Sequence, residues 1–147
     1  MSQASFRNTR AGLSRPLLVV PAIIGAAAVN LALYLVFRAA GADYANTAGV
    51  AVGVPNVLVM TVVPLLIGVT AVLLLARSRP ALLRLGRWGG AVLALLTIAM
   101  TAAAGFNAVS FCALALMHVV VAVAVVTALR PERAGGTEPG AADPRTA

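Results

Sequence analysis

Residues 17–37 decide the fold: they read LLVVPAIIGAAAVNLALYLVF and contain no charged side chain. At about 1.5 Å per residue, a helix of this length spans about 31 Å, the thickness of the hydrocarbon core of a bilayer. Arg residues precede the run, as they precede a secretory signal peptide, but the apolar part of such a peptide has only about 7–15 residues. We therefore predict an uncleaved first transmembrane helix.

Further apolar runs occupy residues 57–76, 88–104 and 111–129. The whole chain is 61% hydrophobic and 10% charged, which lies outside the usual range of soluble globular proteins. The sequence therefore predicts an all-α, integral membrane four-helix bundle over residues 17–130, and its environment is the lipid bilayer. Residues 1–16 form a cytoplasmic N-terminal segment in this prediction. Residues 131–147 are rich in Pro, Gly and charge, and are expected to be a disordered cytoplasmic tail.

The distribution of Arg predicts the orientation of the helices. All 11 basic residues are Arg, and the net charge is +7. Arg38 alone follows the first span, whereas the others lie in the N-terminal segment, in a linker over residues 77–87, and after the fourth span. Basic residues are retained on the cytoplasmic side, so both ends are predicted to lie inside a bacterial cytoplasmic (inner) membrane. Because the Arg residues sit at helix ends and are not interleaved with aromatics, no nucleic-acid partner is predicted.

Polar residues inside the predicted spans are the candidate site, because a polar group in lipid is costly unless it is paired or used. One such residue lies in the outer half of each helix: Asn30, Thr61, Thr97 and His118. Three of them lie seven residues from the outer end of their span, which is about 10 Å deep at helical rise. We predict that these four residues form one interior polar layer, and they are the hypothetical ligand-binding residues.

Three interpretations of this layer remain open at the level of sequence. The layer could be interhelical hydrogen bonding that holds the bundle together. It could line a small outward-facing cavity, with Pro64 loosening the second helix and a neutral His118 able both to donate and to accept a hydrogen bond. In the third interpretation, His118 faces lipid or a second protomer.

The sequence offers no constellation for catalysis or metal binding. The carboxylates Asp43, Glu132, Glu138 and Asp143 all lie outside the predicted spans. A metal centre needs three or four ligands, and the spans contain only His118 and Cys112 as candidates. We therefore predict no catalytic residue, no metal site and no cofactor, and expect that the protein is not an enzyme.

The first connection and the third helix have an expected form. Residues 38–54 carry turn-forming residues, and Asp43 to Asn46 are interpreted as an exposed turn. The third helix is expected to be the shortest, beginning near Trp88 at the membrane interface. Small residues at Gly90, Ala94 and Thr97 form a stripe that favours close helix packing.

The segment Leu114-Ala115-Leu116-Met117-His118-Val119-Val120 in the last span resembles a family of small, uncharacterised four-helix actinobacterial membrane proteins, classed only as a domain of unknown function. The resemblance covers about residues 15–130 and follows the same order of a short third loop and an Arg-bracketed central linker. It implies a four-span topology and draws attention to His118, and it implies no activity.

Two functions are predicted from these observations. The leading one is a non-enzymatic structural or partner-binding subunit of the membrane, with a homo-oligomer or another membrane protein as its companion. The alternative is a binder or carrier of a small apolar or amphipathic ligand, held in an outer-half cavity around His118.

Overall fold

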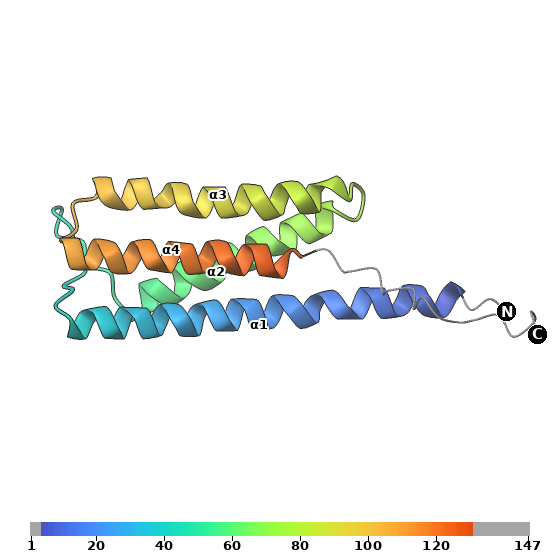
Figure 1. The fold of residues 1–147 in the computed structure, drawn as a ribbon, viewed down its shortest axis with the longest axis horizontal. Coiled ribbons are helices and arrows are strands. Elements are labelled where there is room, and N and C mark those ends of the chain that lie inside the picture. Colours follow the sequence, from blue (N-terminus) through green and yellow to red (C-terminus); the bar gives the residue numbers. More distant parts are fainter. Residues whose placement is uncertain (1–3, 131–147) are drawn as a thin grey trace, which may run out of the picture.

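The structure is a computed structural model that describes residues 4–130, and this part of the chain forms four helices (Figure 1). They are α1 (Ala4–Ala39), α2 (Val54–Leu75), α3 (Ala81–Ala103) and α4 (Ala108–Ala128). Each contains a segment that is long and apolar enough to cross a membrane. The predicted all-α four-helix bundle is thus confirmed, and the chain is a multi-pass membrane protein.

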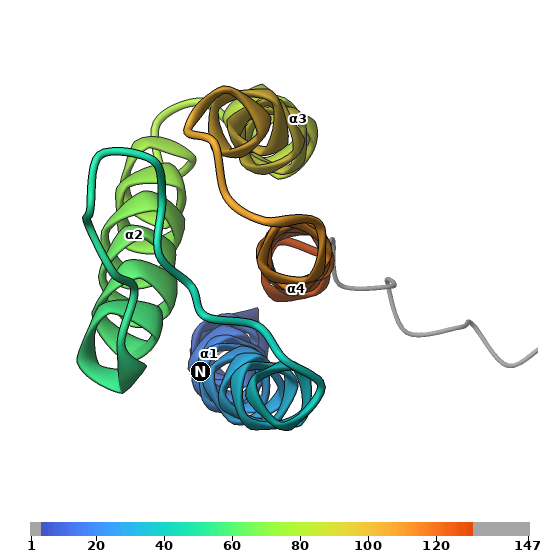
Figure 2. The same ribbon diagram turned by 90° about the vertical axis from the view of Figure 1, so that its left-hand side faces the viewer.

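Helix α4 occupies the centre of the bundle. It packs along α1 on one side and along α3 on the other, so that α1 and α3 have no mutual contact. Helix α2 packs mainly on α1 and leans away from α3 and α4 over much of its length (Figure 2). A cavity lies between α2 and the α3–α4 pair.

Small residues let α3 and α4 approach closely, as the predicted stripe requires. Ala91 and Ala94 of α3 are buried against Ala122 of α4. A Cβ atom on Gly90 would lie 3.0 Å from a methyl carbon of Val125. Close backbone packing of this kind stabilises helix pairs in lipid, where burying apolar surface gives little driving force.

Larger side chains fill two core clusters, one in each half of the bundle. The half that holds the α1–α2 and α3–α4 connections (Figure 1) is called the outer half, after the predicted orientation, and the other the inner half. The inner cluster is aliphatic and includes Val19, Leu65, Val69, Val125 and Leu129. The outer cluster is built around Tyr34, Tyr44, Val57, Ala113, Leu114 and Met117. None of the buried residues of these two clusters belongs to α3.

The sequence prediction was wrong about the third helix and its preceding linker. Helix α3 begins at Ala81, earlier than Trp88, and with 23 residues it is longer than α2 and α4. Arg84 and Arg87, assigned to the linker, are in the first turns of the helix. A long Arg side chain allows this because its aliphatic stem can lie along apolar surface while the guanidinium reaches the interface.

The first helix begins earlier than the predicted span. Helix α1 continues back to Ala4 and has 36 residues, about 54 Å at helical rise, so it is longer than the hydrocarbon core. The predicted disordered tail at residues 131–147 lies outside the described residues. Whether the two ends are cytoplasmic stays a prediction.

Candidate functional site

Asn30 and Thr61 form a buried pair that joins α1 to α2. The side-chain nitrogen Nδ2 of Asn30 donates a hydrogen bond of 2.9 Å to Oγ1 of Thr61. Asn30 is 1% exposed and Thr61 is 3% exposed. Two of the four residues of the predicted polar layer are thus in direct contact.

The other two residues of the layer bond to their own helices. The hydroxyl of Thr97 donates to the carbonyl oxygen of Ala94. Nδ1 of His118 lies 2.7 Å from the carbonyl oxygen of Leu114. The predicted layer is therefore not one continuous network, because α2 leans away and leaves space between these side chains and the Asn30–Thr61 pair.

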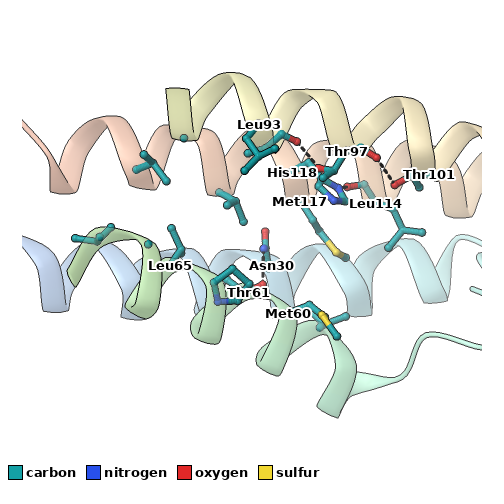
Figure 3. A pocket seen from close by; sticks show the side chains of 18 of the residues that line it. Asn30, Met60, Thr61, Leu65, Leu93, Thr97, Thr101, Leu114, Met117 and His118 are labelled. Atoms are coloured by element: carbon teal, nitrogen blue, oxygen red, sulfur yellow. Dashed lines mark hydrogen bonds between the residues drawn. The ribbon is translucent and has the colours of Figure 1, made fainter. Parts of the chain in front are cut away.

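That space is a cavity of about 760 Å³ between α2 on one side and α3 and α4 on the other. Small-molecule sites in proteins typically have about 300–1,000 Å³. Figure 3 shows Asn30, Thr61, Thr97 and His118 placed around it. The polar side chains that line it are Asn30, Asn56, Thr61, Thr97, Thr101 and His118, and the rest of its lining is apolar or glycine.

The outer end of the cavity lies beneath the α1–α2 connection. Figure 2 shows this connection crossing from α1 toward the outer end of α3 and returning to α2. The hydroxyl of Thr47 donates to the carbonyl oxygen of Ala104, and Val52 and Phe106 line the cavity below. Gly105, in the turn between α3 and α4, adopts a positive φ of 73°. Because Gly105 has no side chain, Thr47 of the α1–α2 connection can pack closely against this turn.

The inner end is narrowed where α2 meets α3. A Cβ atom on Gly86 would lie 2.5 and 2.6 Å from the two methyl carbons of Val72. Between the two ends the cavity opens sideways. Met60 of α2 and Leu93 of α3 both line it, and they are 69% and 64% exposed. The opening therefore faces the surroundings of the helices, which for a membrane protein are the lipid chains.

Among the described residues, the buried polar atom of the cavity lining that lacks a partner is an acceptor. Oδ1 of Asn30 is buried and has no hydrogen-bond partner in the described part of the chain. Figure 3 shows this oxygen on the side of the amide away from Thr61, directed toward α3 and α4. Since a carbonyl can only accept, Nδ1 of His118 carries a proton, and in the neutral ring Nε2 is an acceptor.

Sequence reasoning missed the part played by Tyr44, which was interpreted as belonging to an exposed turn. The side chain is fully buried and its ring stacks on that of Tyr34, with centroids 4.5 Å apart. The phenol donates to the backbone carbonyl of Tyr34 over 3.0 Å. Burial raises the pKa of the Tyr44 phenol, Tyr34 raises it further, and Arg38 opposes the rise.

Ser110 fastens the same connection to the first turn of α4. Its hydroxyl donates to Oδ1 of Asp43 at 3.1 Å and accepts from the backbone N–H of Tyr44 at 2.9 Å. Nothing in the sequence pairs residues so far apart, although a lone Asp in a loop is typical of a turn whose carboxylate accepts hydrogen bonds. The connection over the cavity is thus held at Ser110 and at Ala104.

Within residues 4–130, no three His, Cys, Asp or Glu side chains come together as metal ligands would. Cys112 is exposed on α4. That the protein is not an enzyme and carries no cofactor stays a prediction.

A family model matches most of the chain. The matching model describes a family of unknown function (DUF6069) and covers residues 11–135, so the chain belongs to this family. No curated protein and no solved structure matches the chain.

Proposed function

We propose that this member of a family of unknown function binds a small apolar or amphipathic molecule in the cavity between α2 and the α3–α4 pair. The observation that carries the proposal is the Asn30 amide, which is buried at the cavity and whose Oδ1 has no partner among residues 4–130. Binding without chemistry is the simplest role for such a site, and we propose no catalytic step.

The energetic argument starts from the cost of that oxygen. A buried acceptor without a partner costs about 1–3 kcal/mol, and apolar side chains of similar shape would avoid the cost. If the layer served only to hold helices together, a cavity of about 760 Å³ beside it would forfeit packing that stabilises a bundle in lipid. A ligand that fills the space and donates to Asn30 would offset both losses.

The competing proposal is a structural or partner-binding subunit, in which a homo-oligomer or another membrane protein covers the lateral opening. The two proposals differ in what occupies the cavity, because a subunit interface needs no small molecule there. An occupancy experiment therefore separates them.

A photoreactive hexadecanol, with a diazirine in its chain, is a suitable probe in nanodiscs of defined lipid. Under the proposal, irradiation labels residues that line the cavity, and Phe at Gly68 and Gly89 together reduces the labelling severalfold. Both glycines line the cavity and have open space where a Cβ would lie.

Gly25→Phe is the matched control, because Gly25 also has open space but does not line the cavity. The control variant should be labelled like the wild type. Labelling spread over lipid-facing residues, and unchanged by the two Phe side chains, would sink the proposal. Mass spectrometry of the small molecules that co-purify with the wild type and with its His118→Ala variant then identifies any cellular molecule that is bound to the wild type alone.

The membrane and orientation form a separate proposal. The all-Arg, Ala-rich composition suits a bacterium with a GC-rich genome, such as an actinobacterium, and the Arg distribution favours two cytoplasmic ends in its inner membrane. Reporter fusions after residue 45 and at the C-terminus test it. Periplasmic activity at the C-terminal fusion would overturn the orientation.

A further inference from the structure

We infer that the ligand of the cavity is an uncharged, hydroxyl-bearing lipid of the bilayer, which enters between α2 and α3 and donates its hydroxyl hydrogen to Asn30. The inference rests on the proposed function and adds to it the chemical class of the ligand, the direction of the hydrogen bond and the route of entry.

The lining excludes a charged ligand. No Arg, Asp or Glu is among the described residues that line the cavity. An anionic or cationic head group would lie there without a counter-ion, and burying an unpaired charge is far more costly than burying a hydroxyl. A neutral head group is therefore the one that fits.

The hydrogen-bonding atoms of the lining determine whether the head group must donate or accept a hydrogen bond. The nitrogen of the Asn30 amide already donates to Thr61, whereas its buried oxygen has no partner in the described part of the chain, so the atom that still needs a ligand is an acceptor. The hydroxyls of Thr97 and Thr101 donate to carbonyl oxygens of their own helix and present lone pairs.

Two further atoms are also hydrogen-bond acceptors. Nε2 of His118 is an acceptor in the neutral ring, because Nδ1 donates to Leu114. Pro64 has no backbone N–H, which leaves the carbonyl of Met60 without its usual helical partner, and both residues line the cavity. Donors also line the cavity, namely the Thr61 hydroxyl and the exposed Asn56 amide. The buried lining atom without a partner in the described part of the chain is nevertheless the acceptor Oδ1 of Asn30, and it complements a ligand that donates.

The shape of the cavity determines the route of entry. The α1–α2 connection lies over its outer end, held by Ser110 and Ala104, and Val72 against Gly86 narrows its inner end. The lateral opening is bordered by Met60 and Leu93, both largely exposed. A molecule dissolved in the bilayer can enter there without leaving lipid.

Competition against the photoreactive hexadecanol tests the inference in nanodiscs. The competitors are unlabelled hexadecanol and hexadecyl methyl ether, which share a chain and an oxygen acceptor but differ in the hydroxyl hydrogen. We expect hexadecanol to compete about three- to tenfold more strongly, the factor that one net hydrogen bond gives. Palmitate and hexadecylamine at equal chain length should compete more weakly than the alcohol, because their charges find no partner in the cavity.

Asn30→Leu, which removes the acceptor with little change of size, should reduce the preference for the alcohol over the ether to about one. Thr127→Val is the matched control, since Thr127 bonds to Val123 of its own helix and does not line the cavity. Equal competition by alcohol and ether in the wild type would overturn the inference even if Asn30→Leu failed to fold.

The two proposals fail in different ways. If Phe at Gly68 and Gly89 abolishes labelling while ether and alcohol compete equally, the cavity binds ligands but the inference about the hydroxyl is wrong. If the Phe side chains leave labelling unchanged, the proposed function itself is wrong. A crosslink between the α2–α3 opening and a second copy of the chain, with no competition by either lipid, would overturn both.

Discussion

Gly86→Ala should destabilise the bundle, although alanine is the better helix former. The added Cβ would lie 2.5 and 2.6 Å from the two methyl carbons of Val72, about 1 Å closer than the 3.5–4.0 Å of ordinary carbon contacts. Val72 cannot simply rotate away, because a β-branched side chain in a helix strongly prefers one rotamer and both of its methyl groups are involved. Helices α2 and α3 must therefore separate, or Val72 must adopt a strained conformation.

Gly89→Ala supplies the reference for the size of the effect. It lies on the same helix and has nothing within 4 Å of the new Cβ. Both variants gain about 1 kcal/mol of helix propensity, so the difference between them isolates the overlap. Overpacking of this kind costs about 1–3 kcal/mol, and Gly86→Ala should be less stable than Gly89→Ala by that amount.

Unfolding in mixed micelles with increasing SDS measures this difference as a free energy of unfolding. Val72→Ala in the Gly86→Ala background should restore most of the loss, which appears as coupling in a double-mutant cycle. Equal stability of the two alanine variants, or independent effects of Val72→Ala and Gly86→Ala, would refute the close approach of α2 and α3.

Three further predictions concern the outer face of the bundle. Ser110→Ala leaves the buried backbone N–H of Tyr44 without its acceptor and should lower the free energy of unfolding by about 1–3 kcal/mol; an unchanged SDS midpoint would contradict it. Asn107→Ala removes the side chain that accepts from the N–H of Ser110 at the start of α4, and should cost about 0.5–2 kcal/mol, seen as a lower melting temperature. The raised pKa of Tyr44 means that the folded state favours the neutral phenol, so its contribution is present below the unfolded pKa of about 10 and is lost as pH rises through the folded pKa. Melting temperatures measured from pH 8 to pH 11 should therefore fall at the alkaline end, and less steeply in Tyr44→Phe.

The sequence predicts the helices well because the signal is spread over long apolar runs in which no single residue decides the outcome. It also identifies Asn30, Thr61, Thr97 and His118 as residues of similar depth, and all four line one cavity. The pairing within this set was not predictable. Depth follows from counting residues, whereas the choice of partner depends on the lean of α2, which arises from contacts among many side chains.

The connection between α1 and α2 shows a second limit. Asp43 and Tyr44 have the composition of an exposed turn, and their burial depends on Ser110, which is distant in sequence. Arg84 and Arg87 give the second example. Charge near an apolar run suggests a linker, but both residues already belong to helix α3. In both cases the deciding interaction lies outside the local pattern from which a prediction is made.

The central position of α4 has a consequence for how the protein is made. Helices α1 and α3 touch α4 but not each other, and α4 is the last of the four to leave the ribosome. Until it is inserted, α3 has only its limited contact with α2, and the faces of α1 and α3 that will meet α4 are covered by lipid. Assembly of the bundle is therefore completed only once α4 has been inserted, and a nascent chain arrested before residue 108 would hold an α1–α2 pair with α3 largely unpacked.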